Sequence, residues 1–104
     1  MMGARISERH IETHLMHGVQ ARGGLCLKYF NPSAVGFPDR LCMMPGGVTF
    51  WVELKAPGKR PRKAQELRHL QLRGLGQTVH VADSTEAVDA ILKGYDERRA
   101  GHEI

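Results

Sequence analysis

The stretch VGFPDRLCMMPGGVTFWVELK, residues 35–55, predicts two apolar β-strands joined by a Pro-Gly-Gly turn at residues 45–47. Asp39, Glu53 and Lys55 are charged residues on these mostly apolar segments. Charged side chains are rarely buried without a partner of opposite charge or a metal ion. Their presence on the two predicted strands therefore requires a specific reason.

Side chains alternate between the two faces of a β-strand, which separates the residues of the second strand into two sets. One set is entirely apolar and is expected to be core: Phe50, Val52 and Leu54. The other set places Glu53 and Lys55 beside Trp51. An acid and a base are thus expected on the same face, about 7 Å apart along the strand.

The turn brings a second acid to this face. If it is centred on Gly46, Asp39 lies opposite Glu53 on the neighbouring strand, with Cβ atoms about 4.5–5.5 Å apart. Two carboxylates at that distance repel each other unless a proton or a metal ion lies between them. A hard cation such as Mg²⁺ prefers oxygen ligands of this kind, completed by water and phosphate.

The rest of the chain alternates helices and strands around this hairpin. The predicted elements are a helix that begins after Ser7 and ends at Gly23-Gly24, a strand over 25–30, a loop over 31–38, strands over 39–44 and 48–55, a helix over 62–73, a strand over 77–83, and a helix over 84–95. The order α-β-β-β-α-β-α predicts an α/β fold with a mixed sheet flanked by helices.

Length and composition are those of one folded domain. The 104 residues, 41% of them hydrophobic, suffice for a single core, expected over about residues 7–93, with a polar C-terminal tail over 96–104 that frays. No apolar run approaches the roughly 20 residues of a membrane span, and the N-terminus has no apolar signal-peptide core. We therefore expect a cytoplasmic protein.

The first predicted helix offers a third acid. At about 100° per residue, Glu8 falls in the middle of the apolar stripe formed by Ile11, Leu15 and Val19, and Glu12 falls at its edge. We therefore choose Glu8 over Glu12 as the acid that faces the sheet. The alternative is that Glu8, in the first turn, only complements the helix dipole.

Histidines do not form a convincing metal site. His10, His14 and His17 lie opposite the apolar stripe of the first helix, where a solvated face is expected. His69 and His80 have no partner that the sequence reveals.

Basic residues gather after the second strand of the hairpin. Lys and Arg number 15 against 11 Asp and Glu, and six of the basic residues lie within a short region: Lys55, Lys59, Arg60, Arg62, Lys63 and Arg68. A solvated loop and helix face would explain such a cluster. Beside a chemical site, however, it is compatible with a nucleic-acid partner.

The ordered motifs resemble those of the PD-(D/E)xK nuclease superfamily. Pro38-Asp39 is followed, after the hairpin, by Glu53-Leu54-Lys55. The sequences GFPDR, preceded by Asn-Pro, and VELKAPGKRPRKAQ, which ends at Gln65, are similar to those of the VRR-Nuc family of virus-type replication-repair nucleases. The resemblance covers about residues 8–82 and implies a restriction-endonuclease-like core.

This resemblance implies a role for each matching residue. Asp39 and Glu53 correspond to carboxylates that bind Mg²⁺, for which Mn²⁺ can substitute, and the backbone carbonyl of Leu54 corresponds to a further ligand. Glu8 corresponds to the acid of the first helix, Lys55 to the catalytic lysine, and Gln65 to a positioning glutamine. The residues expected along the DNA backbone are Lys59, Arg60, Arg62 and Lys63.

The resemblance also implies an activity. It predicts a metal-dependent, structure-selective DNA endonuclease that resolves Holliday (four-way) junctions as a homodimer, encoded by a phage or prophage and acting in a bacterial cytoplasm. Three alternatives stay open: a non-catalytic DNA-binding module with the same fold, a flap- or duplex-directed nuclease, and a sequence-specific restriction endonuclease.

Overall fold

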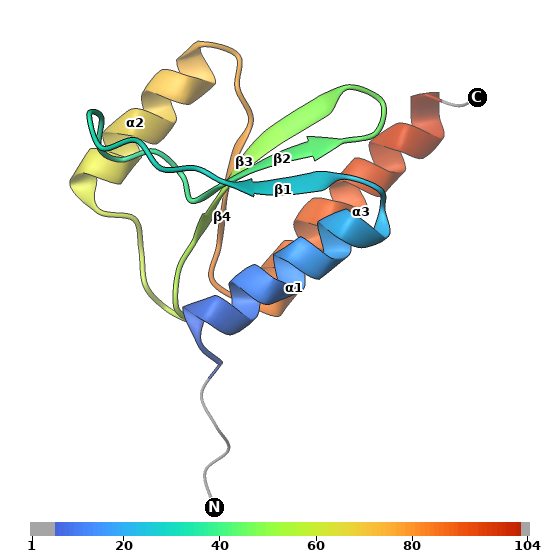
Figure 1. Ribbon diagram of the computed structural model, residues 1–104, viewed down its shortest axis with the longest axis horizontal. Coiled ribbons are helices and arrows are strands. Elements are labelled where there is room, and N and C mark those ends of the chain that lie inside the picture. Colours follow the sequence, from blue (N-terminus) through green and yellow to red (C-terminus); the bar gives the residue numbers. More distant parts are fainter. Residues whose placement is uncertain (1–5, 103–104) are drawn as a thin grey trace, which may run out of the picture.

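A computed structural model describes residues 6–102 of the chain. Over these residues the elements follow the order α-β-β-β-α-β-α, which confirms the predicted order (Figure 1). Their bounds are α1 Glu8–Ala21, β1 Leu25–Lys28, β2 Arg40–Met44, β3 Val48–Leu54, α2 Lys63–Gly74, β4 Val79–Ala82 and α3 Thr85–His102.

The four strands form one mixed sheet in the order β1-β2-β3-β4. β1, β2 and β3 pair antiparallel, whereas β3 and β4 pair parallel. A parallel step needs a crossover connection, and α2 lies within that connection. α1 and α3 cover one face of the sheet and α2 lies over the other, so the predicted α/β class is confirmed (Figure 1).

A separate apolar core lies on each face of the sheet. The larger core joins α1 and α3 to the face that carries Phe50, Val52 and Leu54, as the alternation of β3 predicts. The smaller core, on the α2 side, is built on Trp51 with Leu72 and Val79. Because Glu53 shares the face of Trp51, the charged residues of β3 lie beside the smaller core.

The β2–β3 hairpin has the predicted register. Arg40 lies opposite Val52, and the turn of residues 45–47 contains two glycines with φ angles of 87° and 76°. Positive φ is accessible to glycine at little cost, which explains the Gly-Gly pair. One further step along the register sets Asp39 opposite Glu53.

The expectation that Glu8 faces the sheet was wrong. Ile11, Leu15 and Val19 are fully buried, but Glu8 is exposed, as are all described residues before Ile11. Ser7 caps the helix by accepting a hydrogen bond from the His10 backbone N–H at 3.1 Å. A helical wheel gives the direction of a side chain but not its height along the axis, and the first turn of α1 is not covered.

Residues 96–102, which were expected to belong to a fraying tail, are helical because α3 continues to His102, and residues 103–104 lie outside the described residues. Tyr95 donates a hydrogen bond to the carbonyl of Pro45 at 2.8 Å, and Asp96 pairs with Arg22 at 2.8 Å. These contacts attach the middle of α3 to the hairpin and to α1. Over residues 6–102, no helix is both long and apolar enough to span a bilayer.

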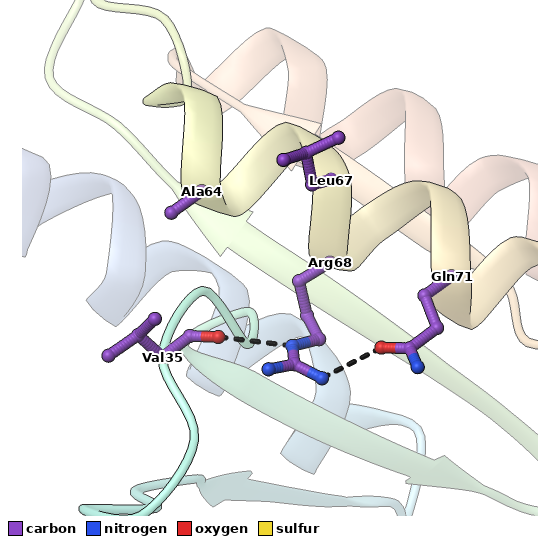
Figure 2. Close-up of a pocket in the computed structure, with 5 residues that line it drawn as sticks. All are labelled: Val35, Ala64, Leu67, Arg68 and Gln71. Carbon is purple, nitrogen blue, oxygen red and sulfur yellow. Dashed lines mark hydrogen bonds between the residues drawn. The ribbon is translucent and has the colours of Figure 1, made fainter.

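The loop between β1 and β2 is fixed against α2 (Figure 2). The Arg68 guanidinium donates to the carbonyl of Val35 at 3.0 Å and lies 4.6 Å from the ring centroid of Phe37. Between these two residues, Gly36 has a φ of 87°, and a Cβ there would meet the carbonyl oxygen of Ala64 at 2.5 Å. The loop therefore holds the start of β2 against the helix.

We predict that Gly36→Ala lowers the free energy of unfolding by about 3 kcal/mol, because strain at positive φ adds to a clash with the backbone of α2. Gly58→Ala is the matched control, since Gly58 has a φ of 77° but no atom within 4 Å of its Cβ position. Gly58→Ala should lower the free energy of unfolding by the backbone strain alone, about 1–2 kcal/mol. Urea denaturation measures both, and equal losses would contradict the close contact.

Candidate active site

Two carboxylates meet where the hairpin strands approach α2. Glu53, on β3, is 1% exposed, and Asp39 immediately precedes β2. Asp39 Oδ2 accepts a hydrogen bond from the backbone N–H of Leu54 at 2.8 Å. This bond ties the aspartate to the strand that carries the glutamate, so the structure brings the predicted acidic pair together.

Lys55 provides the positive charge beside this pair. Its Nζ lies 3.3 Å from Glu53 Oε2, and its side chain is only 14% exposed. The backbone N–H of Lys55 donates to the carbonyl of Ala82 at 3.0 Å, which continues the pairing of β3 with β4 beyond Leu54. The lysine is therefore placed by the sheet rather than by a flexible loop.

Gln65 reaches the same glutamate from α2. Its Nε2 donates to Glu53 Oε2 at 3.0 Å, while its Oε1 accepts from the backbone N–H of Arg62 at 2.8 Å. The side-chain amide is thus held at both ends, by the helix start and by the carboxylate. The structure places this predicted residue in direct contact with Glu53.

His69 is a site residue that the sequence did not reveal. It is 2% exposed, and its Nε2 lies 3.7 Å from Glu53 Oε1. Neither of these two buried atoms has a hydrogen-bond partner. One signal was available: His69 is four residues after Gln65, and residues four apart lie on the same helix face.

The environment of Glu53 disfavours its ionised form. Burial, followed by the nearby charge of Asp39, raises the pKa of Glu53 to about 7, although Lys55 acts in the opposite direction. Burial also lowers the pKa of His69, to which the positive charges of Arg73 and Lys55 contribute. A cation bound at the carboxylates would offset the cost of ionising Glu53.

The residues present suit a hard divalent cation more than a closed cage of protein ligands. Within residues 6–102, no three His, Cys, Asp or Glu side chains converge as a metal site. Mg²⁺ needs only one or two carboxylates, because it keeps waters and takes phosphate oxygens. The buried, unpartnered Oε1 of Glu53 beside Asp39 is consistent with such a cation.

The two acids of α1 have different surroundings. Glu12 Oε2 accepts from Arg40 Nε at 2.8 Å and is therefore engaged in an ion pair. Glu8 is exposed and lines a shallow polar pocket with Lys28 and Arg40. Of the contacts described within residues 6–102, none joins Glu8 to Asp39 or Glu53, so the structure does not assemble the full set of three predicted acids.

Four basic side chains follow the site along the chain and are all exposed: Lys59, Arg60, Arg62 and Lys63. They lie in the β3–α2 connection and at the start of α2. Within this connection, the backbone N–H of Gly58 donates to Asp83 Oδ2 at 3.3 Å, which anchors the loop near the end of β4. The basic cluster thus borders the site without contributing to its buried part.

The chain is similar to known proteins, although no protein-family model matches it. "Putative nuclease p44" of Acyrthosiphon pisum secondary endosymbiont phage 1 is 42% identical over 81 residues, covering 78% of this chain and 87% of that protein. A solved structure described as a VRR_NUC domain matches with a TM-score of 0.79 and 30% identity, covering 85% of this chain and 96% of the other. Both similarities extend over more than three quarters of this chain rather than over a local motif.

Glu53→Gln tests the electrostatic cost of the buried carboxylate. In the folded protein the pKa of Glu53 is about 7, above its ordinary value of 4.5. Folding therefore binds a proton between these values, and the wild type loses stability as pH rises through that interval. In EDTA, the variant should gain stability relative to the wild type from pH 5 to pH 8.

Chemical denaturation at several pH values measures this difference. Glu86→Gln, at an exposed position on α3, controls for the loss of one negative charge. A wild-type-minus-variant difference that stays constant from pH 5 to pH 8 would contradict the raised pKa.

Proposed function

The chain belongs to the VRR-Nuc family of nucleases, and we propose that it is a divalent-metal-dependent deoxyribonuclease that hydrolyses phosphodiester bonds. The observation that carries this proposal is the convergence of Asp39, Lys55 and Gln65 on the buried carboxylate of Glu53. An acidic pair with an adjacent lysine is suited to holding a cation and stabilising a phosphate undergoing attack.

Asp39, Glu53 and the backbone carbonyl of Leu54 would hold the metal, with Mg²⁺ the expected ion and Mn²⁺ a substitute. When bound, such a cation polarises the scissile phosphate and lowers the pKa of a coordinated water. Oxygen ligands from two strands suit this ion because Mg²⁺ retains water and binds phosphate directly. Glu8, at the exposed start of α1, is the candidate for an additional ligand.

Lys55 would act on the reacting phosphate. Its ammonium group is held 3.3 Å from Glu53 Oε2 and is mostly shielded from solvent. From there it can orient the attacking water and offset the negative charge that develops on the phosphate. Gln65 carries no charge and already bonds Glu53, so its role is to hold the carboxylate rather than to move a proton.

The exposed basic cluster of Lys59, Arg60, Arg62 and Lys63 would contact the DNA backbone. Phosphate contacts from Lys and Arg position a protein on DNA without reading its sequence. The cluster joins Lys55 to the start of α2, whose helix dipole also favours phosphate. We therefore expect binding that weakens as salt rises and cleavage with little base specificity.

The substrate we propose is branched DNA, foremost a four-way junction cut by a homodimer. A two-fold dimer would present two equivalent sites to a symmetric junction, which suits paired incisions. Flap or duplex cleavage by the same site is the alternative among nucleases. The chain has every polar residue that the proposed chemistry requires, which argues against a non-catalytic DNA-binding module. Binding alone would need neither Glu53 nor Lys55 in a buried position.

Cleavage of labelled four-way junction, flap and linear duplex DNA tests the proposed function. With Mg²⁺ or Mn²⁺, we expect symmetric cuts in the junction, no cuts in EDTA, and a loss of about 100- to 1,000-fold in rate for Lys55→Ala. Lys93→Ala, at an exposed position on α3, controls for the loss of a lysine and should cleave normally. DNA binding in EDTA without cleavage in any metal, by a folded wild type, would favour the binding module.

Glu8→Gln and Glu12→Gln separate the two acids of α1. We expect Glu8→Gln to reduce metal-dependent cleavage with little change in stability, because Glu8 is exposed. Glu12→Gln should instead lower stability, because Arg40 would lose its ion-pair partner in a partly buried position. Cleavage rates and urea denaturation measure both effects. Full activity of Glu8→Gln together with loss of activity in Glu12→Gln, at unchanged stability, would reverse the assignment.

A further inference from the structure

His69 and Glu53 form the most unusual buried contact among the described residues. Both side chains are almost fully buried, at 2% and 1% exposure, and they approach each other from α2 and β3. Glu53 Oε1 and His69 Nε2 are 3.7 Å apart, and neither has a hydrogen-bond partner. Buried polar groups normally have partners, so this pair of facing atoms requires an explanation.

The two oxygens of Glu53 are unequally satisfied. Oε2 accepts from Gln65 at 3.0 Å and lies 3.3 Å from the Lys55 ammonium, whereas Oε1 has no donor. An imidazole nitrogen that carries a proton is a donor, and His69 Nε2 is the atom closest to supplying one. A shift of less than 1 Å would bring the 3.7 Å separation into hydrogen-bond range.

We propose that His69 is a positioning residue whose Nε2–H donates to Glu53 Oε1, so that α2 holds both carboxylate oxygens, one through His69 and one through Gln65. This inference rests on the proposed function, in which Glu53 is a metal ligand. Each carboxylate oxygen has two lone pairs, and Glu53 can therefore accept these bonds and still bind a cation. Partners of this kind orient metal-binding carboxylates.

Two other roles for His69 are less consistent with the structure. As a metal ligand it would have to converge with two further ligands, but within residues 6–102 no three His, Cys, Asp or Glu side chains do so. As plain core packing His69 would not need to face a carboxylate, and an apolar residue would fill this buried position without leaving an unpartnered nitrogen.

Binding of Mn²⁺ to the full-length protein, measured by calorimetry in the absence of DNA, tests the proposal. His69→Leu removes the donor and should weaken Mn²⁺ binding by about 10- to 100-fold. His69→Gln can supply an amide N–H near the position of Nε2 and should bind within about threefold of the wild type. In cleavage assays, His69→Leu should lower kcat with little change in KM for DNA.

His80→Leu is the matched control. His80 also has a buried Nε2 without a partner, but it packs against Phe50 on the opposite face of the sheet. Its replacement should alter stability and leave the Mn²⁺ affinity unchanged. Equal Mn²⁺ affinities for His69→Leu and the wild type would overturn the positioning role. A wild type that binds no Mn²⁺ would instead contradict the proposed function.

The tautomer of His69 gives a second test that needs no variant to fold. In long-range ¹H–¹⁵N spectra of the Mg²⁺-loaded and metal-free wild type, we expect the proton of His69 on Nε2 in both states. A proton on Nδ1 alone in the metal-free protein would exclude the proposed donor. Loss of the Nε2 proton on metal binding would show that His69 is a ligand and would also overturn the proposal.

Discussion

The burial of one carboxylate, that of Glu53, constrains much of this structure. A buried acid must be paired, protonated or bound to a cation. The groups around Glu53 pair it only in part and also favour its protonated form. Lys55 and Gln65 contact one oxygen, and Asp39 adds a like charge that raises the pKa. A bound cation, as the proposed function requires, would offset the remaining cost of ionising Glu53.

Backbone geometry, rather than long side chains, sets this arrangement. The three-residue turn fixes the β2–β3 register, and this register places Asp39 opposite Glu53. Pairing with β4 continues past Leu54 as far as the backbone N–H of Lys55. α2 lies within the parallel crossover between β3 and β4 and packs over the face of the sheet that carries Glu53. Since these constraints come from the ladder and its connections, the site residues need few contacts beyond one another to be held in place.

The sequence predicted what depends on local geometry and missed what depends on distant contacts. Strand alternation and the Pro-Gly-Gly turn were enough to oppose Asp39 to Glu53. The predicted position of Glu8 was wrong because a helical wheel does not show which turn of α1 the sheet covers. His69 was missed because its partner, Glu53, lies on β3, and the two meet only because α2 packs on that face of the sheet. The roles of the site residues came from the family resemblance and remain predictions.

The division of the domain into two cores explains how it can tolerate this cost. The larger core, between the sheet and α1 and α3, is entirely apolar at its centre and carries most of the buried hydrophobic residues. The smaller core around Trp51 shares its face with Glu53 and His69. The larger apolar core and the candidate site thus lie on opposite faces of one sheet. A ligand that binds only the folded state raises its stability, so a cation bound at Glu53 would stabilise the face that has the smaller apolar core.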